Sequence, residues 1–567
     1  GIPHIYGKSF ADVAFAQGYI TAQDRLVAMD LGRRLAEGTV AELIGDQSPD
    51  AIDQDISMRM HHMRKTAETI WAQLIASSDE KDKELVQVVS FYVAGVNAYI
   101  DDLKAGKYTL PSELIFIYSD KSAQPFDEAD VMALGLLQAF YLAFDADSEI
   151  RRSEIDVAAA MLFDNSMDAD RKARARLAED LQILSPVDKT YSLPGWPGRG
   201  NPLTAARNLP GGSELLALLE TGRKTVTDMG NDHVLHESRG SNNWVVAPSL
   251  SQTGHAMVAN DTHLSLGNPA TFYLSHLNVH SDLPTNDANV MGVQFPGIPG
   301  VILGMNTRIA WGATVSNIDV TDVYKETIVA CDGSPDPCVV WKGKKVPLTP
   351  RKETFKVGSF GRVAKTFDLT FYDVPHHGPI LPRITKTHGI EPLASTELSV
   401  RYTGYEPSQI FRAVHGLDTA KSVREAMAAL ARDFKYGGQN WVIADGDGHI
   451  GWTETVRVPR RQKAYAPWKV LPGDGSAEWG PDMDAKFIPQ AYDPVQGYIA
   501  TANNDPIGVT DDGDPFFGEP EEPMGDQSGP LYLGADYDAG TRVGRITKRI
   551  EIATHGGGKL SLDEMSS

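Results

Sequence analysis

Residues 236–244 read HESRGSNNW, and the Gly240-Ser241 pair inside this stretch decides how the rest of the chain is interpreted. The stretch ends a proline-rich segment, and from Ser241 onward the hydrophobic period becomes two. Residues 243–247 and 255–259 flank a Ser-Gln-Thr-Gly turn, which predicts a β-hairpin. The stretch therefore predicts a strand that begins at a serine directly after a connecting segment.

A serine at the start of a chain carries its own base, because the α-amine lies next to the hydroxyl. An α-amino group has a pKa near ~8, which suits proton transfer at neutral pH. Such chemistry requires a cleavage that creates the new terminus. Gly240 suits that cleavage, since a residue without Cβ permits a strained peptide bond. We interpret Ser241 as a candidate nucleophile released by cleavage after Gly240, with an ordinary loop end as the alternative.

Composition divides the chain into three regions. Residues 1–185 are expected to be mainly helical. Residues 186–240 contain Pro186, Pro194, Pro197, Pro202 and Pro210 and show no sustained apolar period, so they are interpreted as a spacer. From Ser241 onward, predicted strands dominate.

Periodicity predicts the following elements in these regions. Helices are expected at 84–103, 130–146, 168–184, 420–433 and 540–553. Beyond the hairpin, strands are expected at 301–304, 323–330, 339–342, 353–357, 366–372, 398–403, 440–445 and 449–457.

Composition also argues against two classes of protein. The net charge of -22 disfavours a nucleic-acid surface, which needs Lys and Arg to neutralise phosphates. No run of ~18 uninterrupted apolar residues occurs, so no membrane span is expected. The chain begins at Gly1 without Met, and a capping-box pattern at Ser561 and Glu564 stands just before its end. We therefore expect a processed N-terminus and a missing C-terminal part.

The two cysteines, Cys331 and Cys338, flank a turn-forming run at 332–335. Such a turn brings two Cβ atoms within bridging distance, which predicts a small loop disulfide. Two free thiols are the alternative. A disulfide would indicate an exported protein.

Two familiar motifs do not explain the chain. No serine is flanked as G-x-S-x-G, so the nucleophile elbow of α/β-hydrolases is absent from the sequence. Residues 446–451 fit G-x-G-x-x-G, but a strand-like run follows them where a dinucleotide fold requires a helix. A hairpin turn is the better interpretation of that stretch.

The chain resembles the penicillin acylase family of N-terminal-nucleophile hydrolases in five blocks that occur in the family's order. The blocks are GIPHIY (1–6) with AQDRL (22–26) and Arg33-Arg34; SNNWV (241–245); GMN (304–306) with AWGAT (310–314); 440–451 with RVPRRQ (457–462); and GYIA (497–500) with NNDP (503–506). Any single block could arise by chance, whereas five in order identify the family.

The resemblance implies an α+β fold, namely the four-layer αββα sandwich of these hydrolases with a helical small-subunit region. Residues 1–185 would form the small subunit, 186–240 a spacer, and 241–567 a C-terminally truncated large subunit. The two processed subunits would be each other's partners in the bacterial periplasm or outside the cell. The implied reaction transfers the acyl group of a small N-acyl amide to water through a serine acyl-enzyme, without an organic cofactor.

The family's catalytic roles carry over to five positions. Ser241 would be the nucleophile, with its amine as the base. The Val315 backbone N–H and the Asn503 side-chain amide would form the oxyanion hole, which contributes several kcal/mol. His263 would lie near the new amine, and Arg542 would support Asn503. A satisfied strand-end histidine and an Asx turn are the alternatives for His263 and Asn503.

The family also implies one structural Ca²⁺, which hard oxygen ligands favour over zinc. The positions that match its ligands are Glu149, Asp319, Thr321 through its carbonyl, Asp322 and Pro459. Asp536 and Asp538 are candidates for one further ligand. Surface carboxylates without a metal are the alternative.

The acyl pocket of family members that take phenylacetyl groups is lined by bulky and aromatic residues. The matching positions here are Ala139, Ala143, Leu264 and Leu303. Loss of the ring surfaces predicts a preference for medium or long aliphatic acyl groups, such as those of acyl-homoserine lactones. Phe140 and Phe144 could instead turn inward and refill the pocket.

Two other functions stay open at this point. The chain could be a penicillin or cephalosporin side-chain acylase. It could also be an uncleaved homologue that binds amphiphiles without catalysis.

Overall fold

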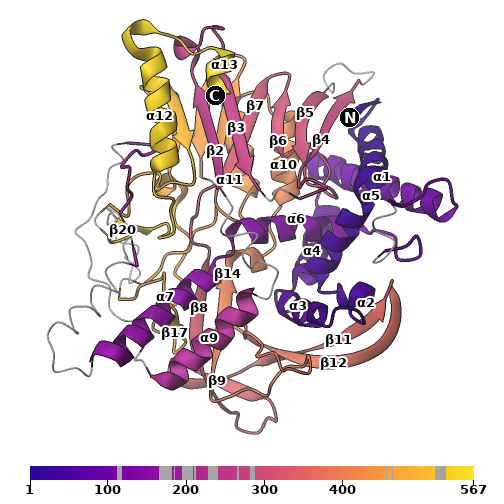
Figure 1. The fold of residues 1–567 in the computed structure, drawn as a ribbon, viewed down its shortest axis with the longest axis vertical. Coiled ribbons are helices and arrows are strands. Elements are labelled where there is room, and N and C mark those ends of the chain that lie inside the picture. Colours follow the sequence, from indigo (N-terminus) through magenta and orange to yellow (C-terminus); the bar gives the residue numbers. More distant parts are fainter. Residues whose placement is uncertain are drawn as a thin grey trace.

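A computed structural model describes most of the chain (Figure 1). The described residues are 1–111, 118–164, 182–183, 185–194, 209, 212–227, 240–264, 267–280, 288–454, 456–462, 464–511, 513–517 and 531–566.

Helices dominate the first part of the chain. They are α1 (Phe10–Glu37), α2 (Ala41–Ile44), α3 (Asp50–Arg59), α4 (Met63–Ala76), α5 (Glu80–Lys104), α6 (Glu128–Ala143), α7 (Ala146–Ala159) and α9 (Ser213–Thr227). The long helices α1 and α5 lie against each other through glycines. A Cβ on Gly18 would meet the Tyr92 carbonyl oxygen at 2.1 Å, and one on Gly95 would meet that of Phe15 at 2.0 Å. The two backbones therefore approach as closely as glycine allows.

Two sheets form the centre of the upper body. The main sheet has the order β1-β4-β5-β6-β7-β15-β16-β18, and a smaller sheet has the order β19-β2-β3. The main strands are β1 (His4–Gly7), β4 (Tyr273–Val279), β5 (Ala288–Gln294), β6 (Leu303–Asn306), β7 (Ile309–Val315), β15 (Gln439–Asp445), β16 (Ile450–Thr453) and β18 (Gln490–Tyr492). The smaller sheet holds β2 (Gly240–Val246), β3 (Met257–His263) and β19 (Tyr498–Thr501).

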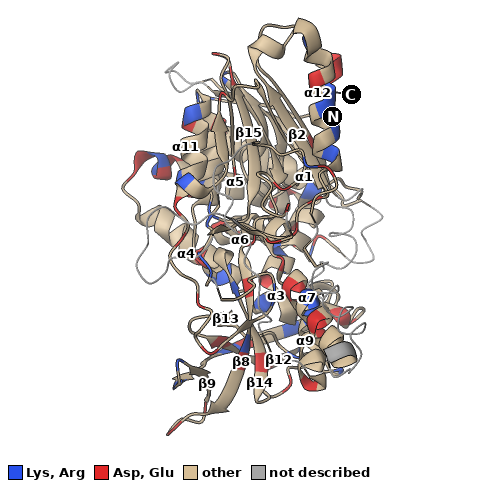
Figure 2. Cartoon of the chain, turned by 90° about the vertical axis from the view of Figure 1, so that its left-hand side faces the viewer, with Lys and Arg blue, Asp and Glu red and all other residues tan. Residues whose placement is uncertain are grey.

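The two sheets lie between helices in four layers (Figures 1 and 2). In Figure 2 the order runs from α11 (Val423–Asp433) through β15 and β2 to α12 (Thr541–Thr554). Helix α10 (Ile410–Thr419) contacts the main sheet on the same side as α11, and α13 (Leu562–Met565) contacts β3. Every residue of β15 is buried because both faces of that strand are covered. This is the αββα sandwich that the sequence predicted.

A lower body of long strands carries the loop disulfide (Figure 1). Its strands are β8 (Thr321–Ala330), β9 (Pro337–Trp341), β10 (Lys344–Pro347), β11 (Thr349–Ser359), β12 (Arg362–Val374), β13 (Gly378–Pro379), β14 (Thr396–Tyr402) and β17 (Leu471–Pro472). Two short strands, β20 (Phe516–Phe517) and β21 (Leu531–Tyr532), form a separate pair. Cys331 and Cys338 are bonded across the turn between β8 and β9, with their Cα atoms 5.2 Å apart. The disulfide prediction is confirmed.

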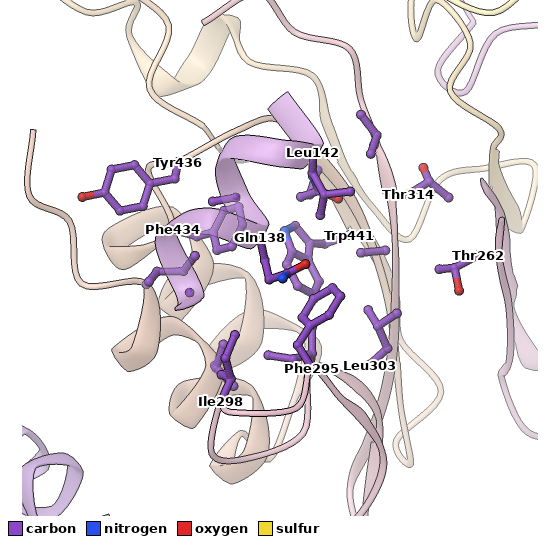
Figure 3. A pocket seen from close by; sticks show the side chains of 18 of the residues that line it. Gln138, Leu142, Thr262, Phe295, Ile298, Leu303, Thr314, Phe434, Tyr436 and Trp441 are labelled. Atoms are coloured by element: carbon purple, nitrogen blue, oxygen red, sulfur yellow. The ribbon is translucent and has the colours of Figure 1, made fainter. Parts of the chain in front are cut away.

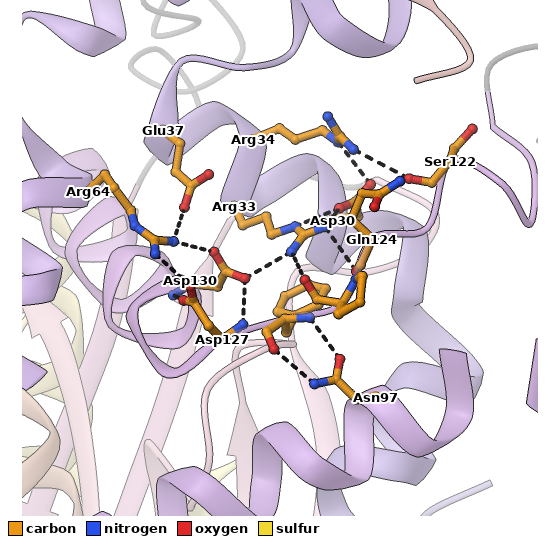
Figure 4. A network of polar contacts seen from close by, with 12 residues as sticks. Asp30, Arg33, Arg34, Glu37, Arg64, Asn97, Ser122, Gln124, Asp127 and Asp130 are labelled. Carbon is orange, nitrogen blue, oxygen red and sulfur yellow. Dashed lines mark hydrogen bonds and ion pairs between the residues drawn. The ribbon is translucent and has the colours of Figure 1, made fainter. Parts of the chain in front are cut away.

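A buried ion-pair network fixes α6 against α1 and α4 (Figure 4). Asp130 of α6 pairs with Arg33 of α1 at 2.9 Å and with Arg64 of α4 at 2.7 Å. Arg64 also bonds Glu37 at the end of α1, at 2.8 Å. Desolvation by burial, together with the charge of Asp130, raises the pKa of Glu37 to about 7. The network matters for function because α6 lines the candidate active site.

Several elements differ from the sequence predictions: β6 begins two residues later than the strand expected at 301–304, β11 and β12 extend beyond 353–357 and 366–372, and three further differences follow. The helix expected over 130–146 ends at Ala143, because Phe144 is extended and α7 begins two residues later. The strand expected over 449–457 is only β16, Ile450–Thr453. Helix α9 lies within 186–240, where no periodic element was expected, and its apolar face packs mainly on α7 and also on β14. The helix expected over 168–184 falls almost wholly outside the described residues.

One helical stretch of the described residues, Glu128–Leu162, is long and apolar enough to cross a membrane by length and composition. Within its most apolar window, 72% is buried in the protein, as it is in core helices that pass the same test.

Candidate active site

Ser241 lies at the start of β2, between β3 and the sheet partner β19. The antiparallel register pairs Gly240 with His263 and Ser241 with Thr262. Ser241 is buried, and its Oγ donates a hydrogen bond to the Gly240 carbonyl oxygen at 2.6 Å. The hydroxyl therefore lies beside the peptide bond whose cleavage the sequence predicts.

Asn503 and Arg542 hold the backbone around this serine. Asn503 Oδ1 accepts from the Ser241 backbone N–H at 2.7 Å and from Arg542 Nη2 at 2.9 Å. Arg542 Nη1 donates to the Ser241 carbonyl at 2.8 Å. Asn503 has φ of 61°, a left-handed conformation that asparagine adopts more readily than most non-glycine residues. The nitrogen that would become the new amine is thus already fixed by a side-chain oxygen.

Val315 ends β7 next to the same serine. Its carbonyl accepts from Asn503 Nδ2 at 2.7 Å, and it lines the cavity that also contains Ser241 and Asn503. Because Nδ2 carries two hydrogens, the Asn503 amide keeps one donor beyond this bond. The structure brings Val315 and the Asn503 side-chain amide together beside Ser241, and the hydrogen bond between them uses the Val315 carbonyl.

His263 lies opposite Gly240 at the end of β3. A Cβ added to Gly240 would come within 3.2 Å of His263 Nδ1 and of both terminal nitrogens of Arg542. His263 Nε2 lies 3.0 Å from Asp261 Oδ2 and 3.3 Å from Asn242 Nδ2. The histidine is therefore close to the bond to be cleaved, with its ring already in polar contacts.

Two cavities of opposite character meet at Ser241, Leu264, Leu142 and Val315. The first, of about 90 Å³, is lined mainly by apolar side chains (Figure 3). The second, of about 310 Å³, is lined by polar groups that include Asn503, Arg542, His263 and Asp538. A substrate bound across Ser241 would place one end in an apolar environment and the other in a polar one.

The expected acyl-pocket positions divide between these cavities. Ala139 and Leu303 line the apolar cavity, Ala143 lines the polar one, and Leu264 lines both. Phe140 is fully buried away from both, stacked on Phe144 at 4.4 Å between ring centroids. Phe144 lines the polar cavity.

Aromatic rings nevertheless reach the apolar cavity from other parts of the chain. They belong to Phe272, Phe295, Phe411, Phe434, Tyr436 and Trp441. The cavity is therefore less purely aliphatic than the four aligned positions suggested.

The guanidinium of Arg461 lies among four of the five residues expected to bind calcium. Its Nη2 donates to Asp319 Oδ1 at 2.8 Å and to the Thr321 carbonyl at 2.9 Å. Its Nε donates to Asp322 Oδ2 at 2.9 Å, and Nη1 lies 3.5 Å from the Pro459 carbonyl. A cation of the protein itself thus contacts these oxygens.

Glu149, the fifth residue, lies beside them with Asp145. The Thr321 hydroxyl lies 2.8 Å from Glu149 Oε1 and 2.7 Å from Asp145 Oδ1. One oxygen from each of Asp145, Glu149 and Asp319 lies within 4.8 Å of the other two. Burial raises the pKa of Asp145 and of Glu149, and neighbouring carboxylates raise both further.

This cluster fits a hard divalent cation. Its four carboxyl groups exceed the one charge that Arg461 supplies, and Asp322 Oδ1 is buried without a hydrogen-bond partner among the described residues. Carboxylate, carbonyl and hydroxyl oxygens are the ligands that Ca²⁺ prefers. The residues present could therefore hold a Ca²⁺ ion next to Arg461, between the carboxyl groups of Asp145, Glu149 and Asp319.

The two candidates for a further ligand pair with arginines instead. Asp536 bonds both terminal nitrogens of Arg152, at 2.9 Å and 2.5 Å. Asp538 Oδ2 accepts from Arg542 Nη2 at 3.1 Å.

Sequence reasoning missed Asp145 and Arg461. Arg461 stood in the block 457–462 without a role, and no local signal shows that its side chain reaches Asp319. Asp145 stands four residues before Glu149, a spacing that places two carboxylates on one helix face and could have been noticed.

A four-layer sandwich with a serine at the start of the central strand of one inner sheet is typical of the N-terminal-nucleophile class of hydrolases. The chain belongs to the Penicillin amidase family, whose profile matches residues 1–567. It is 29% identical over 510 residues to the acyl-homoserine lactone acylase QuiP of Pseudomonas aeruginosa, covering 89% of this chain and 54% of that protein. It is 27% identical over 575 residues to penicillin G acylase of Escherichia coli, covering 97% and 62%.

Among solved structures, the thermostable penicillin G acylase of Alcaligenes faecalis matches with a TM-score of 0.44 and 23% identity, over 57% of this chain and 51% of that one. The chain thus spans 54% and 62% of the length of the two curated relatives above.

Proposed function

We propose that this protein is a self-activating amide hydrolase that removes the acyl group from an N-acyl amide, with an acyl-homoserine lactone as the favoured substrate. The observation that carries the proposal is the position of Ser241 at the junction of an apolar and a polar cavity. An acyl chain suits the first cavity and a polar amine or lactone suits the second. The similarity to acyl-homoserine lactone and penicillin acylases supports the same reaction class.

Activation would begin with attack of Ser241 Oγ on the Gly240 carbonyl carbon. The peptide C–N bond breaks as the ester C–O bond forms, and the Ser241 nitrogen takes up the hydroxyl proton. Water then hydrolyses the ester and leaves Gly240 with a carboxylate. The hydrogen bond of 2.6 Å between Oγ and the Gly240 carbonyl supports this step.

Turnover would use the amine so released. The amine takes the Ser241 hydroxyl proton while Oγ attacks the substrate carbonyl, and it returns that proton to the leaving amine. The Val315 N–H and the free Asn503 N–H would stabilise the oxyanion. Water attacks the acyl-enzyme in the second half of the cycle.

The test of this function is a comparison of native protein and Ser241→Ala. We expect the native large fragment to begin at Ser241 by intact mass, and Ser241→Ala to remain one uncut, inactive chain. Hydrolysis by the native protein is then measured as kcat/KM for an acyl-homoserine lactone series and for penicillin G. A large fragment that begins elsewhere contradicts the mechanism.

Two outcomes would reassign the function. A clear preference for penicillin G would place the protein with the side-chain acylases, an alternative that the aromatic rings of the apolar cavity favour. An uncut native chain that binds amphiphiles without turnover would make it a non-catalytic homologue.

We also propose one structural Ca²⁺ in the acidic cluster, held by Glu149 and Asp319 together with Asp145. Bound there, the ion would supply positive charge that ties the first region of the chain to the region after Ser241, and it would take no part in the chemistry. The excess of buried carboxylates over Arg461 supports this assignment.

Export to the periplasm or the medium is proposed as well. The Cys331–Cys338 disulfide supports it, because such bonds persist in oxidising compartments. Peptide mapping of protein purified from the native compartment should find the two cysteines joined, and free thiols there would remove the argument.

A further inference from the structure

The apolar cavity contains two carboxamides, those of Gln138 and Gln439, that have no hydrogen-bond partner among the described residues. On α6, the residues that line it are Gly135, Gln138, Ala139 and Leu142, which is the spacing of one helix face. On β15, Gln439 and Trp441 line it from one face of the strand. A helix and a strand thus each place one glutamine among apolar cavity-facing side chains.

Two other polar groups of the cavity wall are paired, whereas the buried Trp441 Nε1–H also has no hydrogen-bond partner among the described residues. Thr314 shares a hydrogen bond of 2.9 Å with Thr501, and the Tyr436 hydroxyl bonds the Glu406 carbonyl and the Ser408 N–H. Within the described part of the chain, the carboxamides of Gln138 and Gln439 have no hydrogen-bond partner. Figure 3 shows the Gln138 carboxamide pointing into the cavity among Leu142, Phe295 and Trp441.

Unpaired carboxamides would make the cavity discriminate between plain alkyl chains and chains that carry an oxygen. Each offers a donor and an acceptor, so in the free enzyme water would satisfy them. A plain alkyl chain would displace that water without replacing its hydrogen bonds, which is unfavourable. A chain with an oxygen at the right carbon would restore them.

The place of the oxygen follows from the strand register. Gln439 pairs with Val315 across β15 and β7, and Val315 lies beside Ser241 at the junction of the two cavities. The Gln439 side chain therefore lies near the end of the cavity where the scissile carbonyl would bind.

We propose that Gln138 and Gln439 form a subsite for an oxygen substituent on the acyl chain, so that the preferred substrates are amides of β-oxo or β-hydroxy acids. This inference rests on the proposed function and specifies its substrate class. A keto group would accept from a carboxamide N–H, whereas a hydroxyl could also donate to the carboxamide oxygen.

The kinetic test compares acyl-homoserine lactones of one chain length that are unsubstituted, 3-oxo or 3-hydroxy. We expect the native enzyme to favour an oxygen-substituted chain about tenfold in kcat/KM, as one satisfied hydrogen bond would give. Gln138→Met keeps the side-chain length and removes both hydrogen-bonding groups of one subsite residue, so the ratio should fall well below tenfold, and it should reach about one when Gln439→Met is added. The matched control Gln87→Met makes the same substitution at an exposed position of α5, outside both cavities, and should leave the ratio near tenfold.

A preference for 3-oxo chains alone would assign recognition to the carboxamide N–H, and a preference for 3-hydroxy chains alone would assign it to the carboxamide oxygen. Equal ratios in native enzyme and Gln138→Met would overturn the subsite.

A binding test separates the subsite from the proposed function. Calorimetry with 3-hydroxy and unsubstituted carboxylic acids of equal length needs no turnover. If no acyl-homoserine lactone is hydrolysed but the 3-hydroxy acid binds about tenfold more tightly to native protein than to Gln138→Met, the subsite stands and the proposed reaction fails. Equal binding of both acids to native protein would sink the subsite whatever the kinetics show.

Discussion

At the scale of single residues, the candidate active site depends on the side chains that lie close to the Gly240–Ser241 peptide bond. Asn503 and Arg542 share hydrogen bonds with the two ends of the Ser241 backbone, so a movement of either reaches the nucleophile. The left-handed Asn503 is over-determined by these bonds and by its contact with the Val315 carbonyl. Small changes here should alter chemistry more than stability.

Gly240→Ala tests this crowding. The new Cβ would lie 3.2 Å from Arg542 and His263 nitrogens, closer than side chains normally pack, so both side chains must move by a few tenths of an ångström, and Arg542 also bonds the Ser241 carbonyl. We expect self-cleavage to slow by on the order of tenfold, since misplacement of reacting groups by a fraction of an ångström is costly. The rate of self-cleavage is measured by mass spectrometry, as the fraction of uncut chain that remains at successive times after synthesis.

The control for that experiment is Gly446→Ala, where the nearest atom to the new Cβ is 3.7 Å away. If Gly240→Ala matures as fast as Gly446→Ala, the absence of a Cβ at the cleavage position is not required.

At the scale of elements, the helical layer is held by backbone contact as well as by side chains. Gly18 and Gly95 let α1 and α5 cross without an intervening Cβ, and the Asp130 network then positions α6 against α1 and α4. Because α6 supplies one wall of the apolar cavity, the packing of these helices determines the shape of the acyl site.

Gly95→Ala should destabilise the protein although alanine is the better helix former. Its Cβ would overlap the Phe15 carbonyl oxygen at 2.0 Å, which forces the helices apart. Overpacking of this kind typically costs about 1–3 kcal/mol, more than the gain of up to about 1 kcal/mol in helix propensity. Urea unfolding measures the difference. A stability at or above that of the unsubstituted protein would show that the helices can separate without penalty.

Glu37 should give the helical layer a pH-dependent stability. Its pKa is raised to about 7 in the folded protein, above the ordinary value of 4.5, so the folded state keeps a proton that the unfolded chain releases. Stability is then fully present below about pH 4.5, falls as the pH rises towards 7, and levels off above it. Glu37→Gln should remove a decline on the order of 1 to 3 kcal/mol.

Urea unfolding between pH 5 and 8 compares Glu37→Gln with Glu68→Gln. Glu68 bonds the same Arg64 but its side chain is 56% exposed, so its substitution should leave the decline in place. Parallel pH profiles for the two variants would contradict the assignment to Glu37.

At the scale of the whole molecule, segments far apart in sequence meet in the acidic cluster. Helix α7 contributes Glu149, β8 contributes Asp322, and Arg461 comes from a connection more than 130 residues further along the chain. The cluster therefore links the region before the spacer to the region after Ser241. An ion bound there would strengthen a contact that must survive the cleavage of the chain.

Calcium should raise the stability of the processed protein. We expect a lower Tm in excess chelator than in 1 mM Ca²⁺, because an ion that binds only the folded state stabilises it by mass action. Mg²⁺ at the same concentration is the control, since it loses water reluctantly and suits a different geometry. Asp319→Asn should abolish the calcium effect. Equal Tm values in chelator and in calcium would show that Arg461 alone balances the cluster.

Local patterns in the sequence were enough to predict several parts of the fold. The change of hydrophobic period at Ser241 predicted the hairpin of β2 and β3, and the two cysteines around a turn predicted the disulfide. These features depend on residues a few positions apart, where backbone preferences and turn chemistry dominate. The order of five family blocks then implied the four-layer sandwich.

Only the tertiary structure decided what those residues touch. Three features depend on contacts between residues more than a hundred positions apart. They are the position of the Arg461 guanidinium among the expected calcium ligands, the aromatic side chains that reach the apolar cavity, and the unpaired carboxamide of Gln138. Helix α9 was missed although Leu215, Leu219, Gly222 and Val226 form a buried stripe at helical spacing, and the structure packs it mainly on α7 and also on β14. Side-chain contacts of this kind follow from the global packing, which periodicity within a single segment does not encode.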